Sequence, residues 1–337
     1  MPEIYIKRTG AIGRITLARP EALNSLTAEM LSKIEMALDN WENDPNIAAV
    51  VIDAEGEKAF CAGGDITDIY KQGKRKNFKY GQQFWANEYR LNLKISRYPK
   101  PYLAFMQGYT MGGGVGISCH GSHRIVGETS IVSMPECGIG LVPDVGGSFL
   151  LARLEQNIGE YLGTTAYRMD AGDSIFCHFA DHYIPIERWP YVIKELAGHG
   201  DVDYAISKYQ QEHPKSKLIK IAPIIAEVMH PKDYSLLEKR MSKYSELAIG
   251  LKNLKRNSPL SVAFTYSMLK IPEVSKNVES ALDIEYRYTS RAQETTDFLE
   301  GIRAMVIDKD KAPQWKHSAL SEVNLEEVEA LLVPVNN

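Results

Sequence analysis

The chain has 337 residues, of which 44% are hydrophobic and 24% are charged, so it is long enough to bury a large core. Its net charge of -4 gives no electrostatic reason to expect a nucleic-acid partner, because such partners usually require a basic face. No apolar run approaches the roughly 20 residues that cross a bilayer, so we expect no membrane partner either.

The first residues and the cysteines indicate the cellular compartment in which we expect the protein. From Ile4 the sequence alternates like a strand, and this pattern fits neither a signal peptide nor a transit peptide. The four cysteines include no CxxC pair and are too few for a disulfide framework. We therefore expect a reduced, cytoplasmic protein.

The first part of the chain predicts alternating strands and helices. Residues 4–7 and 13–17 form two short strands around a glycine-bounded turn, which is typical of a hairpin. Thr27 is a favoured N-cap for a helix whose apolar residues follow at helical spacing. Residues 48–52 and 102–106 are apolar runs of strand length, as found in strands buried on both faces of a sheet. Together these patterns predict a layered α/β core.

The composition changes after about Pro185. From there on, β-branched runs are few and helix-length amphipathic segments are frequent, such as residues 234–248 and 278–300. We therefore expect a catalytic core over residues 1–200 and a mainly helical region over 201–337 that packs on it.

Two glycine-rich turns each follow a predicted buried strand: residues 62–66 (AGGDI) and 111–116 (MGGGVG). Glycine lets the backbone approach a ligand, and free amides at a helix start bind negative charge. Two such turns are consistent with two amides that meet on one developing oxyanion. A tight turn that needs glycine only for packing explains either one equally well, and neither has the GxGxxG spacing of a dinucleotide site.

Two acids lie in an otherwise apolar, glycine- and proline-containing segment, residues 134–147. Glu136 and Asp144 are its only charged residues. An acid among apolar neighbours tends to have a perturbed pKa, as acid–base or nucleophilic catalysis requires. The alternative interpretation is structural, with Glu136 a solvated loop acid and Asp144 a helix N-cap.

Other candidate sites fail on spacing. Cys119, His120 and His123 match no standard metal site, so we expect no metal. Residues 116–120 are similar to the GxSxG nucleophile elbow, but His120 stands where its second glycine belongs.

Residues 62–65, 108–114 and 134–147, in this order, resemble the enoyl-CoA hydratase/isomerase (crotonase) superfamily. Residues 19–24 (RPEALN) resemble that family's early segment that lines coenzyme A. Residues 111–116 with 143–147, and residues 298–310 with 313–315, look like the 3-hydroxyisobutyryl-CoA hydrolase branch. The resemblance covers nearly the whole chain and implies a crotonase-like α/β fold, with a (ββα)-repeat spiral core and a mainly helical C-terminal region.

The resemblance also implies roles for particular residues. Gly64 and Gly113 would supply the oxyanion-hole amides, and Glu136 would be the catalytic carboxylate. The catalytic group as a whole comprises Glu136, Asp144, Gly64 and Gly113. The substrate-binding group, which lines the acyl pocket, comprises Glu88, Gly113, Glu136 and Asp144. The residues that would bind coenzyme A are Ala22, Leu23, Ala62, Asp65 and Ile66.

One departure from the family pattern decides the expected chemistry. Hydratases of this family use two glutamates, and here Gly116 stands where the first belongs, while Glu136 keeps the second. Addition of water to a double bond needs an acid and a base together. Asp144, where hydratases carry a small residue, matches the hydrolase branch.

The resemblance therefore implies hydrolysis of a short 3-hydroxyacyl-CoA, 3-hydroxyisobutyryl-CoA above all, to the free acid and coenzyme A, a step of valine catabolism. No metal or redox cofactor is implied, since coenzyme A is part of the substrate. Two alternatives stay open: a hydratase or isomerase with rearranged acids, and a coenzyme A-binding protein without catalysis. The pattern also leaves open whether Glu136 attacks directly or activates water, and whether the protein is a monomer or a homotrimer.

Overall fold

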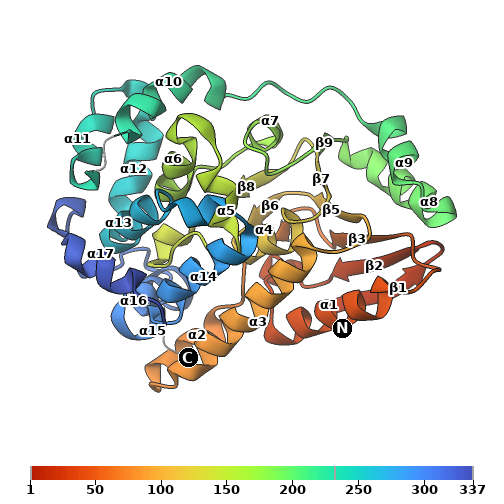
Figure 1. Cartoon of the computed structure of the whole chain (residues 1–337), viewed down its shortest axis with the longest axis horizontal. Helices are drawn as coiled ribbons and strands as arrows, with labels where there is room; N and C mark the ends of the chain where they lie inside the picture. Colours follow the sequence, from red (N-terminus) through yellow and green to blue (C-terminus); the bar gives the residue numbers. More distant parts are fainter. Residues whose placement is uncertain (1, 231–232, 336–337) are drawn as a thin grey trace. The chain divides into compact units, whose positions relative to one another are not determined.

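The computed structural model describes residues 2–230 and 233–335. Figure 1 shows the helices and strands coloured along the chain. The described residues form two compact units, each built from three stretches of the chain. The described residues of unit 1 fall within Met1–Gly64, Arg90–Ser133 and Arg168–Lys217. Those of unit 2 fall within Asp65–Tyr89, Met134–Tyr167 and Leu218–Asn337.

Unit 1 contains two β-sheets. The larger sheet has the order β1-β2-β3-β5-β7-β9, in which β1 and β2 form the predicted antiparallel hairpin and the other neighbouring pairs are parallel. The smaller sheet, β4-β6-β8, is parallel throughout. The strands are Ile4–Thr9 (β1), Ile12–Leu17 (β2), Ala49–Ala54 (β3), Ala59–Cys61 (β4), Tyr102–Met106 (β5), Tyr109–Met111 (β6), His123–Val126 (β7), Ile131–Ser133 (β8) and His182–Tyr183 (β9).

Successive strands alternate between the two sheets: β3, β5 and β7 belong to the larger sheet, and β4, β6 and β8 to the smaller one. Helices follow each strand pair along the chain. Thr67–Lys74 (α2) and Phe78–Ser96 (α3) follow β4, Gly113–Ser118 (α4) follows β6, and Gly147–Ala152 (α5) comes after β8. This is the strand–strand–helix repeat that the family resemblance implies.

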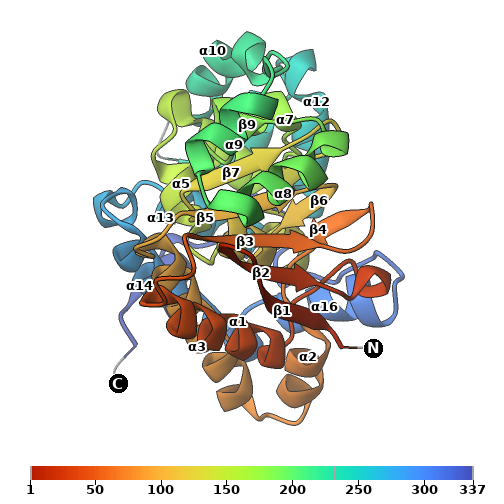
Figure 2. The ribbon, with the colours of Figure 1, turned by 90° about the vertical axis from the view of Figure 1, so that its right-hand side faces the viewer.

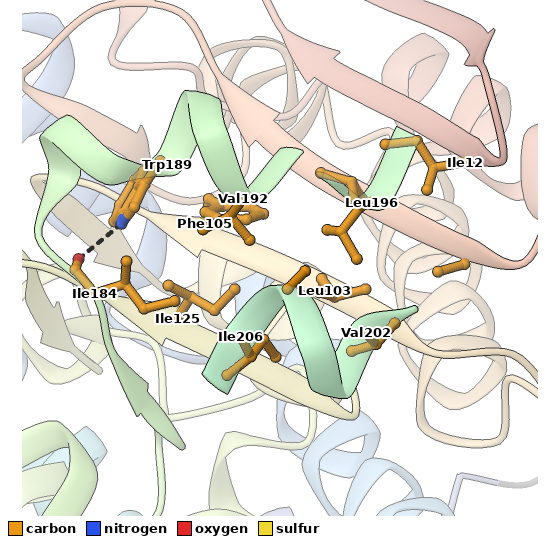
Figure 3. Packing of buried hydrophobic residues seen from close by; sticks show 13 residues of the cluster. Ile12, Leu103, Phe105, Ile125, Ile184, Trp189, Val192, Leu196, Val202 and Ile206 are labelled. Atoms are coloured by element: carbon orange, nitrogen blue, oxygen red, sulfur yellow. Dashed lines mark hydrogen bonds between the residues drawn. The ribbon is translucent and has the colours of Figure 1, made fainter. Parts of the chain in front are cut away.

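Helices α8 (Trp189–His199) and α9 (Val202–Tyr209) lie over one face of the larger sheet (Figure 2). Apolar side chains from the sheet and from both helices form one buried cluster (Figure 3). Within it the Phe105 and Trp189 rings meet edge to face at 5.3 Å, and the Trp189 indole N–H donates to the Ile184 carbonyl at 2.8 Å. The cluster satisfies the one polar group of its largest ring while keeping it out of water.

Helix α1 (Ala28–Glu42) begins where the sequence predicted. The Thr27 side chain accepts a hydrogen bond from the Met30 amide at 3.2 Å, which caps the helix. Its buried side chains follow helical spacing, and Trp41 comes so close to β2 that a Cβ on Gly13 would lie 2.4 Å from its ring. Glycine at this position therefore lets the helix pack closely on the strand.

The stretch from Leu218 onward contributes helices and, among its described residues, no strand. None of the helices within the described residues is both long and apolar enough to cross a bilayer. The α-helices of unit 2 after Met134 are α5, Ile158–Thr165 (α6), Leu218–Met229 (α10), Leu237–Met241 (α11), Ala248–Arg256 (α12), Pro259–Met268 (α13), Val278–Thr289 (α14), Ala292–Thr295 (α15), Phe298–Ile302 (α16) and Leu325–Leu332 (α17).

Both helix-length segments named from the sequence are broken. The segment 234–248 is interrupted after Met241, where the Ser242 hydroxyl donates to the Lys239 carbonyl at 2.9 Å. The segment 278–300 is interrupted after Thr289 and again at Thr296, whose hydroxyl accepts from the Phe298 amide at 3.3 Å. Serine and threonine side chains that bond to nearby backbone compete with the helix, and an amphipathic pattern does not reveal this competition.

The units also follow a different division from the single boundary expected at residue 200. Asp65–Tyr89 and Met134–Tyr167 come from the first half of the chain, yet they belong to unit 2 with the helices after Leu218. Composition reports what each segment contains and not which segments contact one another. Sequence alone therefore gave no sign of this interleaving.

Candidate active site

The two glycine turns follow neighbouring strands of the smaller sheet. Because β4 and β6 are parallel, the turns after Cys61 and Met111 leave the sheet at the same edge. Gly63 (φ 115°) and Gly112 (φ 50°) both have backbone conformations that L side chains rarely adopt. A Cβ on Gly63 would lie 3.5 Å from the Met111 carbonyl oxygen and 3.9 Å from the Gly113 nitrogen. The turns are therefore side by side, as their proposed joint role requires.

The glycines of the second turn serve different purposes. A Cβ on Gly114 would lie 2.3 Å from the Cys61 carbonyl oxygen, so this glycine is needed for close packing of α4 on β4. Gly113 is the first residue of α4, and the amides of a helix's first turn have no acceptor within the helix. The packing interpretation thus applies to Gly114, while the Gly113 amide is of the kind that can bind a ligand oxygen.

The early segment that resembles a coenzyme A lining lies against the first glycine turn. The Ala62 amide donates to the Leu23 carbonyl at 3.0 Å, and the Leu26 amide donates to the Gly63 carbonyl at 2.9 Å. Leu23 itself has a left-handed backbone (φ 51°) just after the 3-10 helix that ends at Ala22. Unit 1 therefore brings three of the predicted coenzyme A residues together: Ala22, Leu23 and Ala62.

The other two predicted coenzyme A residues, Asp65 and Ile66, continue the chain from Gly64 to the start of α2. Ile66 is the N-cap residue of that helix, but its side chain does not cap it. The Asp65 carboxylate accepts a hydrogen bond from the Thr67 amide at 3.3 Å. Asp65 thus helps to fix the entry into α2.

Three predicted acids, Glu88, Glu136 and Asp144, are buried together in unit 2. Glu88 lies on α3, Glu136 begins the 3-10 helix Glu136–Ile139, and Asp144 lies in the turn before α5. They are 3%, 3% and 4% exposed, respectively. The alternative that Glu136 is a solvated loop acid is therefore wrong, because the fold buries its side chain.

Burial raises the pKa of every one of these acids, and the Asp144 charge raises it further at Glu88 and Glu136. Burial raises the pKa of Glu88 well above its usual range, and the nearby Asp144 charge raises it further. The pKa of Glu136 is raised by burial first and then by Asp144. Burial raises the pKa of Asp144 to about 7, against the opposing effect of a hydrogen bond from Tyr89. Acids with such pKa values suit proton transfer near neutral pH.

Two carboxyl oxygens in this group have no hydrogen-bond partner among the described residues. They are Oε1 of Glu88 and Oε2 of Glu136. Nearly all buried polar atoms in proteins are hydrogen-bonded, and leaving one unpaired costs about 1–3 kcal/mol. Unpaired acceptors on two neighbouring acids are therefore consistent with a site that a hydrogen-bonding ligand completes.

Asp144 does not cap α5, which corrects the structural alternative. The N-cap residue is Gly146, two positions further on, and it has no side chain to offer. Asp144 instead accepts a hydrogen bond from the Tyr89 hydroxyl at 2.9 Å. The chain takes two left-handed residues between Asp144 and the helix, a path that sequence spacing did not indicate.

The sequence interpretation missed two residues of the acid group, Tyr89 and Glu285. Glu285, on α14, is fully buried, and its pKa is raised to about 8 by burial first and by Asp144 second. Tyr89 directly follows Glu88 and bonds to Asp144. A signal for Glu285 existed, because it follows the buried Ala281 by four residues and so places an acid on the apolar side of an amphipathic helix.

No group of three or more His, Cys, Asp or Glu side chains within residues 2–230 and 233–335 is arranged to hold a metal. All four cysteines are buried and reduced. Burial raises the pKa of Cys119 to about 11, so this thiol has little thiolate character.

Unit 1 contains paired glycine turns on a strand–strand–helix repeat, and unit 2 contains a group of buried acids; each is a feature of acid–base or acyl-transfer enzymes. A sequence model of the enoyl-CoA hydratase/isomerase family matches residues 12–332. The chain belongs to this family.

Comparison with known proteins gives relatives over nearly the full chain. The chain is 36% identical over 338 residues to the bovine (Bos taurus) protein named 3-hydroxyisobutyryl-CoA hydrolase, mitochondrial, covering 97% of this chain and 87% of the relative. Among solved structures, an enoyl-CoA hydratase from Rhodobacter sphaeroides 2.4.1 is 46% identical with a TM-score of 0.94, covering 99% of this chain and 98% of that one. A carnitinyl-CoA dehydratase from Mycobacterium thermoresistibile is 34% identical with a TM-score of 0.94, covering 100% and 98%. The predicted fold class is confirmed.

The raised pKa of Asp144 predicts how stability depends on pH. Its pKa rises from 3.8 to about 7 on folding, so between these values the folded protein holds a proton that the unfolded chain has released. The stability due to this proton is fully present below the unfolded-state pKa of 3.8. It is lost as the pH rises through the folded-state pKa of about 7. We expect the urea midpoint of the wild type to fall between about pH 4 and about pH 7, and to fall less steeply in Asp144→Asn. An unchanged slope in this variant, with Asp283→Asn as the exposed control, would contradict the assignment.

Proposed function

We propose that this protein hydrolyses a short 3-hydroxyacyl-CoA, with 3-hydroxyisobutyryl-CoA as its substrate, to 3-hydroxyisobutyrate and coenzyme A in valine catabolism. The observation that carries the proposal is the buried acid group, in which Glu88 and Glu136 each present an unpaired oxygen. Similarity to a named 3-hydroxyisobutyryl-CoA hydrolase along 97% of this chain supports the substrate.

The amides of Gly64 and Gly113 would receive the thioester oxygen. Negative charge develops on that oxygen when the carbonyl is attacked, and preorganised amide donors stabilise it. Two observations support this role: the two turns are adjacent, and the Gly113 amide belongs to the first turn of α4. Ala22, Leu23, Ala62, Asp65 and Ile66 would hold the coenzyme A portion.

Glu136 would perform the chemistry in one of two ways. As a nucleophile, its oxygen forms a bond to the thioester carbon and expels the thiolate, and water then hydrolyses the resulting anhydride. As a general base, it takes a proton from the water that attacks the same carbon. Both courses require the carboxylate, and both are helped by a raised pKa, which makes that carboxylate a stronger base.

Asp144 and Glu88 would recognise the 3-hydroxyl of the acyl group. A buried carboxyl acceptor that pairs with a substrate hydroxyl discriminates strongly against an acyl group without it, because the acceptor is then left unpaired. Glu88 fits this role through its unpaired Oε1, and Asp144 through its place beside Tyr89 in the same acid group.

Hydration of an enoyl-CoA is the competing activity, since one structural relative is named an enoyl-CoA hydratase. Gly116, in α4, occupies the position where the family resemblance places the first hydratase glutamate. A glycine cannot transfer a proton, so the pair of acids that hydration needs is incomplete at this position. The other alternative is a coenzyme A-binding protein without catalysis. Such a protein would have no use for buried acids with unpaired oxygens.

Location and assembly remain predictions. A cytoplasmic location is proposed, whereas the bovine relative is named as mitochondrial. Monomer and homotrimer are both compatible with the sequence, and native mass spectrometry distinguishes them. No metal or redox cofactor is proposed to take part.

Release of free thiol tests the proposed activity. With 3-hydroxyisobutyryl-CoA, we expect the wild type to release coenzyme A thiol and Glu136→Gln to lose at least about 100-fold in kcat, because the reacting carboxylate is gone. Binding of coenzyme A should be nearly unchanged in the variant. Turnover of crotonyl-CoA without thiol release would instead support a hydratase, and no turnover of any acyl-CoA a binding protein.

A pair of substitutions at one position tests the oxyanion role. Proline is tolerated at the first position of a helix and lacks an amide hydrogen, whereas alanine keeps it. We expect Gly113→Pro to reduce kcat by about 10²–10³-fold and Gly113→Ala to reduce it much less. Both variants should first be shown to be folded by circular dichroism. Equal activity in the two folded variants would remove Gly113 from the catalytic group.

Asp144→Asn separates recognition from chemistry. Asparagine can still accept the Tyr89 hydrogen bond but loses the charge. If Asp144 holds the 3-hydroxyl, kcat/KM should fall by about 10- to 100-fold with 3-hydroxyisobutyryl-CoA and much less with isobutyryl-CoA, which lacks that group. Equal losses on both substrates would point to a direct catalytic role, and no loss on either would remove Asp144 from the site.

A further inference from the structure

The backbone that carries Asp144 is strained. Asp144 is followed by Val145 (φ 54°) and Gly146 (φ 76°), both of which have left-handed backbone conformations. This region suits glycine but is a genuine outlier for a β-branched residue such as valine. Such a conformation persists only where the surrounding structure holds it in place.

Glu285 supplies contacts that can hold this turn. Its Oε2 accepts a hydrogen bond from the Gly146 amide at 2.9 Å, and its Oε1 accepts from the Ser148 amide at 3.1 Å and from the Ser148 hydroxyl. Asp144, the acid nearest to this turn in the sequence, bonds to it only through its backbone: its main-chain carbonyl accepts a hydrogen bond from the Gly147 amide at 2.7 Å. No local side chain caps α5, and the amides of its N-cap residue Gly146 and of Ser148 are bonded to an acid 139 and 137 residues away in the chain.

A second residue of α14, Thr289, contacts the hydrogen-bond donor of the Asp144 side chain. The Tyr89 hydroxyl, which donates to Asp144, also lies 3.2 Å from the Thr289 hydroxyl oxygen. Glu285 and Thr289 are four residues apart on α14, so they share one face, and both are fully buried. One face of α14 therefore fixes Asp144 twice, through its backbone turn and through its hydrogen-bond donor.

Three converging donors favour Glu285 as a carboxylate, because a protonated carboxyl would have to give up one acceptor position. Burial and the Asp144 charge act against this and raise the pKa of Glu285 to about 8. Glu285 has no unpaired side-chain oxygen, unlike Glu88 and Glu136. Its acceptor positions are engaged by protein donors, which suits a supporting residue better than one that meets the substrate.

We propose that Glu285 is the positioning residue for Asp144: its carboxyl group holds the strained Val145–Gly146 turn so that Asp144 meets the substrate's 3-hydroxyl. The proposal deepens the proposed function and rests on it. It assigns to α14, in the helical C-terminal stretch, a part in acyl-group selection.

Substrate selectivity tests the proposal, because a residue that serves stability alone would not change it. In Glu285→Gln one of the two amides faces an NH₂ group instead of an oxygen, so the turn loosens. We expect kcat/KM for 3-hydroxyisobutyryl-CoA to fall by about 10- to 100-fold and that for isobutyryl-CoA to fall much less, since small displacements from working geometry have effects of this size. Asp283→Asn, an exposed acid on the same helix, is the matched control and should keep wild-type selectivity.

A double-mutant cycle adds a second criterion. If Glu285 acts through Asp144, then Glu285→Gln should change selectivity little further in an Asp144→Asn background, because residues that share one function are not additive. Equal losses on both substrates, or a selectivity loss that adds fully to that of Asp144→Asn, would overturn the proposal.

Two further measurements cover the other outcomes. If Glu285→Gln does not fold, Ser148→Ala removes one donor from the carboxylate, and the same selective loss, smaller in size, is expected. Hydrogen exchange of the peptide over residues 144–150 does not depend on activity and should be faster in the folded variant than in Asp283→Asn. Unchanged exchange would overturn the positioning role, whereas absence of thiol release from the wild type would overturn only the proposed function.

Discussion

Four carboxyl groups are buried together in unit 2, and the free energy of charging any one of them depends on the others. Burial raises the pKa of Glu88, Glu136, Asp144 and Glu285, and the Asp144 charge raises the pKa of the other three. Desolvated like charges repel one another, so these acids do not ionise independently. The hydrogen bonds around it decide which acids accept from protein donors and which keep a free oxygen.

Those hydrogen bonds divide the group into supported and open members. Glu285 is engaged by the start of α5, and Asp144 by Tyr89. Glu88 and Glu136 keep unpaired oxygens inside the protein. In the proposed function, the 3-hydroxyl of the acyl group would meet Glu88 and Asp144 and the reacting carbon would meet Glu136, while Glu285 would hold the geometry of Asp144. The glycine turns of unit 1 use backbone amides instead, and their placement depends on the pairing of β4 and β6.

Periodicity and turn chemistry made much of the fold predictable. The hairpin, the capped helix after Thr27 and the buried strand at residues 102–106 follow from patterns within a few residues, and all are present. The helices after Tyr234 and Val278 were harder, because Ser242 and Thr296 interrupt them through side-chain bonds to the backbone. Amphipathic periodicity continues through such a break and therefore hides it.

The sequence by itself determined the family, the two glycine turns and three of the buried acids, because each lies in a short segment of distinctive composition. Only the tertiary structure decided that Asp144 is not a helix cap, that the unpaired oxygens belong to Glu88 and Glu136, and that Glu285 joins them. Glu285 lies 139 residues from Gly146 in the chain, and local patterns carry no information about such a contact. Burial and hydrogen-bond partners result from tertiary packing, so the chemistry of these acids could be inferred only from the folded structure.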